Sequence, residues 1–316
     1  MNFSIIVPFY NEEGNLLQLN KEISDFVIAN KKKNFNFELI YVDDCSKDKS
    51  LKICSKFQNS FRTKLVKHRM NLSQADSIRT GVSVSNYDNL IFLDADLQND
   101  ISDLNEMINI FVEDYDMVIG NRVNRKDNFF SKKLPSLIAN KLVRFFTSSK
   151  ANDHGCAIKI LKKKVFLSSS SLGDFHRLLS AEAFNLGFKI KEIDVNHRER
   201  FSGSSKYGMS RIFRVLLDLI YLNFMRNYQN RSLYFFGVFS FMSILIASLI
   251  LIFMFYLKYF ENISFIETPL PILGSTFFLM SINFLLIGIL AHFNFSKNFE
   301  DNKSNKHFIE FEKDIS

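Results

Sequence analysis

The chain is poor in several residue types that mark particular classes of protein. Its 316 residues include no tryptophan, four prolines, eleven glycines and three cysteines. The cysteines, Cys45, Cys54 and Cys156, form no CxxC pair and have no histidines at zinc-finger spacing. We therefore expect reduced thiols in a cytosolic domain and no structural zinc.

Several targeting and nucleotide-binding motifs are also missing. No GxGxxG or GxxxxGK[ST] pattern occurs, which argues against a dinucleotide site or a P-loop. The first apolar run, Phe3 to Tyr10, is short, contains Pro8 and has no basic leader, so it predicts a β-strand and not a signal peptide. We expect the N-terminal domain to stay in the cytosol.

Charged residues are missing from two long stretches near the C-terminus. Residues 232–257 contain no Asp, Glu, Lys or Arg, and neither do residues 268–295, which include only His292 as a weakly basic side chain. A membrane-spanning helix needs about 20 apolar residues. The sequence therefore predicts two transmembrane helices, at about 232–257 and 268–293, joined as a hairpin. Buried soluble helices are the alternative, but such helices rarely stay uncharged on every face for so long.

Basic residues flank this hairpin on both sides. They are Arg211, Arg214, Arg226 and Arg231 before the first span, and Lys297 and Lys303 after the second. Because positive residues prefer the cytoplasmic side, both termini are expected in the cytoplasm. A hairpin without internal charge offers no proton relay or ion site, so we interpret it as an anchor.

The rest of the chain alternates strand-like and helix-like segments. Strands are predicted at 3–8, 37–42, 64–68, 90–93 and 117–119, and helices at 15–30, 48–57, 73–84 and 102–113. This alternation is typical of an α/β fold with a mainly parallel sheet and helices on both faces. The predicted domains are a catalytic domain at 1–206, a juxtamembrane amphipathic segment at 207–231, the hairpin at 232–295 and a polar tail at 296–316.

Acidic and turn-forming residues follow three of the predicted strands. The segments are 8–12, 43–48 and 94–98. In parallel sheets ligands bind beyond the carboxyl ends of the strands, so these segments should meet at one edge. Asp94 and Asp96 there are suited to a hard divalent cation, which a nucleotide diphosphate needs. Alternatives stay open: a solvated acidic turn for this pair, and helix capping for Asp43 and Asp44.

These motifs together resemble the family 2 glycosyltransferases of the GT-A fold. The residues that carry the resemblance are Ile5-Ile6-Val7-Pro8, Tyr10-Asn11-Glu12, Val42-Asp43-Asp44, Ser46, Asp48 and Asp94-Ala95-Asp96-Leu97-Gln98. Further matches resemble the polyprenyl-phosphate glycosyltransferases, which include dolichol-phosphate mannose synthases and bacterial bactoprenol glucosyltransferases. Those matches are Gly120-Asn121-Arg122, Asp153-His154-Gly155-Cys156, His176-Arg177, Arg200, Gly203, Ser205, Lys206 and Tyr207.

The resemblance implies a role for each group of residues. It implies a metal and diphosphate site (Asp94, Asp96, Gln98), with Asp96 catalytic, and a nucleotide-sugar pocket (Pro8, Tyr10, Glu12, Asp43, Asp94, Arg200, Lys206). It also implies an acceptor-phosphate site (Arg122, Lys132, Ser136) and a base (Asp153). Lys132 stands where relatives often carry Arg, which keeps the charge but loses the forked geometry. Asp153 has an alternative role as a turn cap or as a group that orients the acceptor.

The implied reaction moves a sugar from a UDP- or GDP-sugar to undecaprenyl or another polyprenyl phosphate, with Mg²⁺ or Mn²⁺. A single displacement would invert the anomeric centre. Two amphipathic stretches, near 134–145 and 212–222, would lie in the headgroup plane or pack in the core. The resemblance and the Lys-, Asn-, Phe- and Ile-rich composition favour a multi-pass protein of the bacterial inner membrane.

Other functions remain to be weighed. A processive synthase usually has more spans and a QxxRW-type motif, which this tryptophan-free chain lacks. Transfer to another glycolipid or polysaccharide, or a non-catalytic nucleotide-sugar-binding scaffold, stays open. The net charge of +7 also suits nucleic acid, but acidic residues occupy the predicted cleft, so we expect no nucleic-acid partner. Bundling of the spans into a homo-oligomer is left open.

Overall fold

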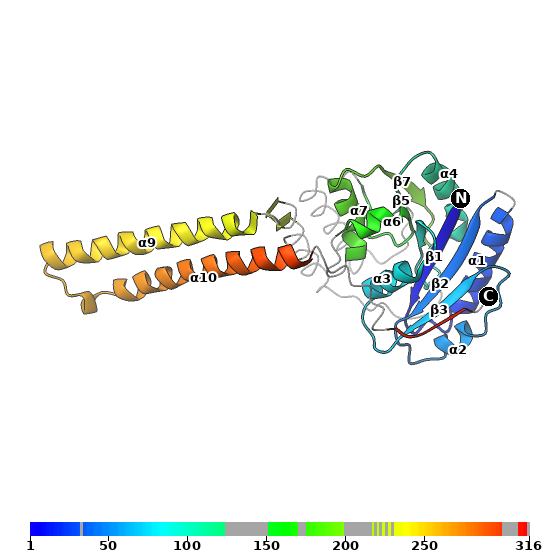
Figure 1. Cartoon of the computed structure of the whole chain (residues 1–316), viewed down its shortest axis with the longest axis horizontal. Helices are drawn as coiled ribbons and strands as arrows, with labels where there is room; N and C mark the ends of the chain where they lie inside the picture. Colours follow the sequence, from blue (N-terminus) through cyan, green and yellow to red (C-terminus); the bar gives the residue numbers. More distant parts are fainter. Residues whose placement is uncertain are drawn as a thin grey trace. The chain divides into compact units, whose positions relative to one another are not determined.

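The computed structural model describes residues 1–31, 34–123, 151–169, 175–198, 231–298 and 309–314, together with 217, 220, 223, 224, 227 and 228. It divides into two compact units, Met1–Ile220 with Lys303–Ser316, and Tyr221–Asn302. The first unit contains the sheet and the second contains a helical hairpin (Figure 1). Each unit is described separately below.

The described residues of the first unit form one eight-stranded sheet with the order β7-β5-β6-β4-β1-β2-β3-β8. The strands are β1 (Asn2–Phe9), β2 (Asn36–Asp43), β3 (Thr63–His68), β4 (Asn89–Phe92), β5 (Met117–Arg122), β6 (Lys159–Lys162), β7 (Ile190–Val195) and β8 (Ile309–Asp314). The pairs β1–β2, β1–β4, β2–β3 and β5–β7 are parallel, whereas β6 and β8 run antiparallel to their neighbours. The α/β prediction with a mainly parallel sheet is confirmed.

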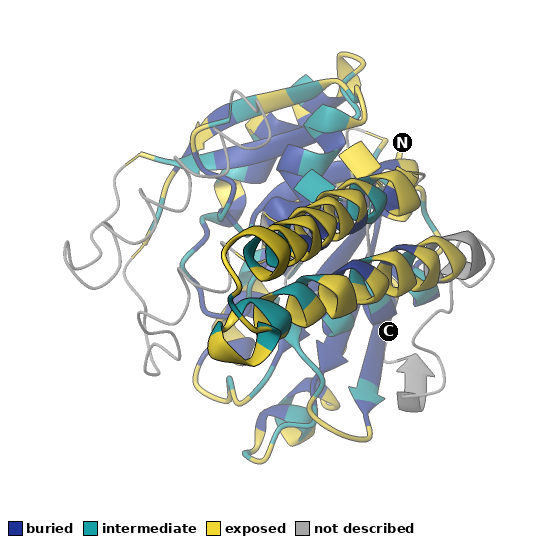
Figure 2. Cartoon of the chain, turned by 90° about the vertical axis from the view of Figure 1, so that its left-hand side faces the viewer, coloured by how far each residue is buried: buried dark blue, intermediate teal, exposed yellow. Residues whose placement is uncertain are grey.

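Helices cover both faces of this sheet. The helices are α1 (Leu16–Asn30), α2 (Ser50–Cys54), α3 (Gln74–Val84), α4 (Leu104–Val112), α6 (Lys163–Leu167) and α7 (Phe175–Asn185), with the short helix η2 (Ile101–Asp103) before α4. One apolar core joins α1, α2 and α4 to the sheet, and a second joins α3, α6 and α7 to its other face. The strands β1, β2, β3 and β4 are almost entirely buried between these two layers (Figure 2).

Close packing of α3 on β1 depends on one glycine. A Cβ atom at Gly81 would overlap the Cγ2 of Ile6, a fully buried residue of β1. The helix can therefore approach the strand more closely than any side chain would allow. This contact holds the N-terminal end of α3 beside the carboxyl ends of β1 and β4.

The elements predicted between residues 3 and 119 are all present, with small shifts of their ends. The strands β6, β7 and β8 are not among the predicted elements. β8 lies within residues 296–316, for which the sequence predicts only a polar tail, and it pairs with the edge strand β3. The chain therefore leaves the first unit, passes through the hairpin and returns to the sheet it left.

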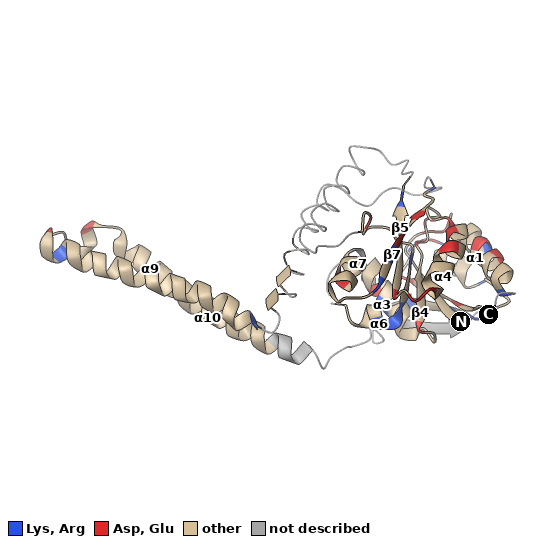
Figure 3. Cartoon of the chain, turned by 90° about the horizontal axis from the view of Figure 1, so that it is seen from above, with Lys and Arg blue, Asp and Glu red and all other residues tan. Residues whose placement is uncertain are grey.

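The second unit contains two long helices packed against each other, α9 (Ser232–Phe260) and α10 (Leu270–Asn298), with the short helix η5 (Phe265–Glu267) between them. Ser232–Phe260 and Leu270–Phe293 are long and apolar enough to cross a membrane, and 17% and 11% of their apolar windows are buried. Such exposure is unlike the core helix of a soluble domain. Figure 3 shows both helices uncharged along most of their length, with charged residues in their connection.

Small residues lie where α9 and α10 meet. The Ser240 and Ser281 hydroxyls are 3.0 Å apart and buried. A Cβ atom at Gly288 would lie 3.5 Å from the Cα of Leu233 on the facing helix. Small side chains let apolar helices approach closely where no hydrophobic effect drives them together, as in a bilayer.

Candidate functional site

Three loops meet at the carboxyl edge of the sheet, as the strand order requires. β1 lies between β2 and β4, and all three run parallel, so the segments after Phe9, Asp43 and Phe92 emerge side by side. Strand spacing puts the ends of β2 and β4 roughly 10 Å apart. The chain order reverses at β1, since β2 and β3 lie to one side and β4 to the other. Ligands of open α/β sheets bind at such a reversal.

The first two loops are tied together by hydrogen bonds. The Asn11 N–H donates to the Ser46 hydroxyl at 3.0 Å, and the Lys47 N–H donates to the Asn11 amide oxygen at 2.7 Å. The Glu12 N–H donates to the Ser50 hydroxyl at 2.8 Å. These bonds fix the loop that carries Tyr10 and Glu12 against the loop that carries Asp43 and Asp44.

Each of the three loops also holds one residue in the left-handed region. The φ angles are +56° at Asn11, +64° at Cys45 and +60° at Leu97. This region is costly for Cys and Leu, which have a Cβ atom that crowds the backbone. Backbone strain of this kind persists where surrounding contacts enforce it and often marks functional loops.

Asp43 and Asp44 have different surroundings although they are adjacent. One oxygen of Asp43 accepts from the Ser46 N–H at 2.9 Å, and the other is buried without a partner among the described residues. Burial raises the pKa of Asp43, and hydrogen bonds from Ser46 oppose that rise. Asp44 accepts instead from Leu72 N–H and Asn71 Nδ2, and its Oδ1 lies 2.9 Å from His68 Nδ1. Neither residue caps α2; Asp43 closes its own turn and Asp44 anchors the 71–72 loop.

The acidic pair after β4 is oriented by amide groups. Asp94 accepts from the Gln74 side chain at 2.6 Å, and Asp96 accepts from the Gln98 N–H at 3.2 Å. Asp96 is 8% exposed. Gln74 begins α3, so the close approach of α3 to β1 delivers this contact. Nothing in the sequence indicates that Gln74 contacts the acidic pair, except that it follows a parallel strand by a few residues.

The segment after β7 lies against the loop that follows the acidic pair. The Arg198 N–H donates to the Gln98 carbonyl at 2.9 Å, and the Arg198 guanidinium lies 3.0 Å from both Asp100 and Glu22. The Asn196 N–H donates to Asp103 at 2.7 Å. Two of the predicted donor-binding residues, Arg200 and Lys206, lie further along the chain and outside the described residues.

Arg122 and Asp153 are brought together as an ion pair. The guanidinium Nε and Nη2 donate to the two carboxylate oxygens at 2.6 and 2.8 Å. Burial would lower the pKa of Arg122, but its bonds to Asp153 outweigh that effect and raise it. The Gly155 N–H also donates to Asp153, at 3.2 Å. Lys132 and Ser136, the other two predicted acceptor residues, lie outside the described residues.

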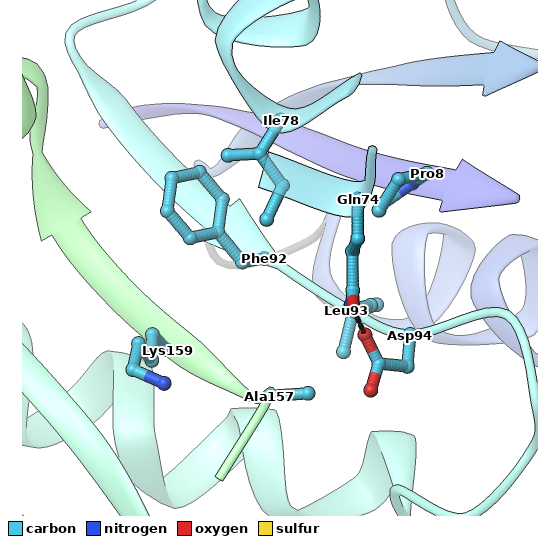
Figure 4. Close-up of a pocket in the computed structure, with 8 residues that line it drawn as sticks. All are labelled: Pro8, Gln74, Ile78, Phe92, Leu93, Asp94, Ala157 and Lys159. Atoms are coloured by element: carbon cyan, nitrogen blue, oxygen red, sulfur yellow. Dashed lines mark hydrogen bonds between the residues drawn. The ribbon is translucent and has the colours of Figure 1, made fainter. Parts of the chain in front are cut away.

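A small pocket extends beneath Asp94 (Figure 4). Its lining residues are Pro8, Gln74, Ile78, Phe92, Leu93, Asp94, Ala157 and Lys159. Pro8 is buried at the end of β1, and Lys159 is 3% exposed. Burial lowers the pKa of Lys159. The one sequence signal that could have indicated a buried lysine at this site is its place within the apolar run 156–161.

The α/β sheet, with an acidic pair after β4 and a buried carboxylate at the end of β2, has the arrangement that the resemblance to glycosyltransferases of the GT-A fold implies. The chain belongs to glycosyl transferase family 2, whose model matches residues 4–170. The fold is similar to that of S. aureus TarS 1–349, with a TM-score of 0.50 and 16% identity over 100% of this chain and 99% of that one.

Two curated relatives are similar in sequence. The dodecaprenyl-phosphate galacturonate synthase of Rhizobium johnstonii is 30% identical over 98% of this chain and 92% of that protein. The undecaprenyl-phosphate 4-deoxy-4-formamido-L-arabinose transferase of Shewanella sediminis is 31% identical over 69% of this chain and 65% of that protein. The first match covers nearly the whole chain, including the two helices that are long and apolar enough to cross a membrane.

Proposed function

We propose that this chain transfers a sugar from a nucleotide-sugar to a polyprenyl phosphate and releases the nucleoside diphosphate. One observation carries the proposal. At one edge of the sheet, an oriented acidic pair meets a buried carboxylate oxygen that has no partner among the described residues. The names of both relatives, which are polyprenyl-phosphate sugar transferases, support the acceptor.

Asp43 is suited to recognise the donor's base. Its unpartnered oxygen is a hydrogen-bond acceptor, and both uracil and guanine carry ring N–H donors. A buried acceptor without a partner costs free energy until a ligand donates to it. Pro8, Tyr10 and Glu12, from the neighbouring loop, would complete the pocket, and Arg200 and Lys206 would bind the diphosphate.

The acidic pair fits a divalent cation that is shared with the ligand. Among the described residues no group of three or more His, Cys, Asp or Glu side chains could hold a metal alone. Mg²⁺ usually takes one or two carboxylates and completes its shell with water and substrate phosphates, which suits a two-carboxylate site. Asp94 and Asp96, with Gln98, would hold Mg²⁺ or Mn²⁺. Bound there, the cation offsets negative charge on the diphosphate.

The acceptor phosphate can act as the nucleophile without a protein base. The second pKa of a phosphate monoester is about 6, so the group is largely ionised at pH 7. Its oxygen attacks the anomeric carbon, the bond from that carbon to the diphosphate oxygen breaks, and the electron pair leaves with the diphosphate. No proton has to move, and the anomeric centre inverts.

Arg122 then serves the acceptor through its remaining donors. A guanidinium has five N–H groups, of which Asp153 takes two, so three can reach a phosphate. Asp153 fixes the plane of the guanidinium group and is better suited to orient Arg122 than to accept a proton. Lys132 and Ser136 would join Arg122 at the acceptor phosphate.

The path of the chain supports the proposed membrane topology. An even number of spans returns a chain to the side from which it started. Met1–Ile220, which precede the hairpin, and strand β8, which follows it, belong to the same sheet-containing unit. Both termini and the catalytic unit would then lie in the cytoplasm, at the bacterial inner membrane.

A donor screen with the purified full-length chain tests the proposed function. Undecaprenyl phosphate, Mg²⁺ or Mn²⁺ and a panel of UDP- and GDP-sugars are incubated with the enzyme, and lipid-linked product is measured by mass spectrometry. Asp96→Asn should lower the rate by about 100-fold or more, because the cation loses a carboxylate. The exposed Asp25→Asn is the matched control, with an unchanged rate expected.

Two results would contradict the proposal. One is transfer to another glycolipid or polysaccharide acceptor with none to polyprenyl phosphate. The other is nucleotide-sugar binding without turnover under any metal, which would make the chain a binding scaffold. An α-linked product from an α-linked donor, seen by NMR coupling constants, would contradict single displacement alone.

A further inference from the structure

A buried ammonium group lies in the middle of the sheet, beneath the proposed transferase site. Lys159 is the first residue of β6 and is 3% exposed. β6 runs between β4 and β5, where Lys159 pairs with Phe92 and Ile119. Asp94 follows Phe92 by two residues, and Arg122 follows Ile119 by three. Lys159 therefore lies next to both strand ends that lead to the site.

The contacts of Lys159 are with the main chain and not with an acidic side chain. Its Nζ donates to the Cys156 carbonyl and lies 3.5 Å from the His154 carbonyl. These carbonyls belong to the turn that follows Asp153, the residue paired with Arg122. Among the described residues, no carboxylate lies within ion-pair distance of the ammonium.

Burying a charge without a counter-ion costs free energy, so folding stability alone does not account for Lys159. An apolar side chain of similar length would avoid this electrostatic cost. The charge is useful only if something negative comes near it. Burial disfavours the charged form of the lysine and lowers its pKa, whereas Asp153 and Asp94 favour the charged form.

The pocket shows where the charge is directed. Figure 4 shows Lys159 at the start of β6 and Ala157, two residues before it, at one side of the pocket, and Gln74 and Asp94 at the other. Ile78, Phe92 and Leu93 supply apolar walls. Charges interact more strongly across apolar surroundings than across water. The ammonium can therefore act on groups bound above Asp94 without touching them.

We propose that Lys159 is a positioning residue of the transferase site. It holds the turn that carries Asp153, and through that turn it positions the Arg122–Asp153 pair. It also supplies a fixed positive charge beneath the two phosphate groups. This proposal rests on the proposed function. The donor diphosphate and the acceptor phosphate repel each other, and Arg122 is partly neutralised by Asp153. A preorganised buried cation lowers that repulsion without any rearrangement on binding.

Lys159→Met and Lys159→Arg, in the full-length chain, test the proposal. Methionine keeps the length and removes the charge, whereas arginine restores it. We expect Lys159→Met to raise KM for polyprenyl phosphate about tenfold, with a smaller change in kcat, and Lys159→Arg to recover to within about threefold of the wild type. The thermal midpoint of Lys159→Met should change little, because relief from burying a charge offsets the loss of the hydrogen bond to the Cys156 carbonyl.

Lys162→Met is the matched control, because Lys162 lies on the same strand but pairs with Asp116 at the surface. Its KM should be unchanged. A KM for Lys159→Met within twofold of the wild type would overturn the proposal. So would a large fall in its thermal midpoint with no recovery in Lys159→Arg, since that pattern describes a structural role only.

A binding measurement with nucleoside diphosphate distinguishes a failure of this proposal from a failure of the proposed function. UDP and GDP, each with Mn²⁺, are titrated into the wild type and Lys159→Met by calorimetry. If the wild type binds one of them but forms no lipid product, the acceptor assignment fails while Lys159 is still tested. A threefold or greater loss of affinity in Lys159→Met supports the fixed charge, and equal affinity overturns it.

Discussion

Replacing Asp43 by Asn should weaken nucleotide binding while leaving the fold as stable as before, or more so. The second carboxylate oxygen of Asp43 is buried without a partner among the described residues. An Asn side chain can keep the bond from the Ser46 N–H with its oxygen. Its NH₂ group would then point a donor at the ligand's own N–H donor.

The size of the loss follows from the bond that disappears. A hydrogen bond to a charged acceptor contributes about 1.5–3 kcal/mol, which corresponds to a roughly 10- to 100-fold rise in Kd. The effect on stability has the opposite sign. Because burial raises the folded-state pKa of Asp43, the native state is penalised once the pH rises through that pKa. A neutral Asn removes this penalty at pH 7.

Calorimetric titration with UDP and GDP, together with urea unfolding, measures both effects. The neighbouring Asp44→Asn provides the contrast. Asp44 already accepts from Leu72 N–H and contacts His68, so its replacement should lower the free energy of unfolding by about 1–3 kcal/mol. An Asp43→Asn protein with wild-type nucleotide affinity, or with a stability loss like that of Asp44→Asn, would refute the reasoning.

Two further predictions concern stability. Gly81→Ala should lower the free energy of unfolding by about 1–3 kcal/mol, because its methyl group overlaps Ile6 in a packed core; an unchanged urea midpoint would contradict this. Partial burial tends to raise the pKa of Asp116, but hydrogen bonds from Lys164 and Lys162 outweigh it and lower the pKa to about 2. The ionised carboxylate therefore stabilises the fold above pH 4, and this stabilisation is lost as the pH falls toward 2. Asp116→Asn should lower the free energy of unfolding by about 1 kcal/mol at pH 7, allowing for solvent screening, and should leave it unchanged near pH 2. Urea unfolding across that pH range measures both effects.

The features predicted correctly from sequence are those set by local pattern. The strands and helices predicted up to Ile119 are present, and the acidic segments at 43–44 and 94–96 lie at the ends of β2 and β4, the two parallel strands on either side of β1. Their meeting at one edge needs no knowledge of tertiary contacts, because the carboxyl ends of parallel strands share an edge. The two apolar helices likewise follow from length and composition.

The features that sequence could not provide depend on contacts between distant segments. β6 is a four-residue strand inserted antiparallel between β4 and β5, and nothing in its own pattern specifies that position. Gln74 reaches Asp94 only because α3 packs closely on β1. The sequence assigns Arg122 and Asp153 to separate roles, whereas their pairing appears only once β5 and the 151–158 segment lie side by side.

The last strand has a consequence for how the protein is made. β8 pairs with β3 along Thr63–His68, yet it follows both apolar helices in the chain. A ribosome therefore completes the hairpin before it delivers the strand that closes this side of the sheet. Until then β3 presents unpaired backbone groups of the kind that recruit foreign strands. Completion of the sheet is in this way delayed until both apolar helices have been made, and a nascent chain stalled within α10 would be prone to aggregate.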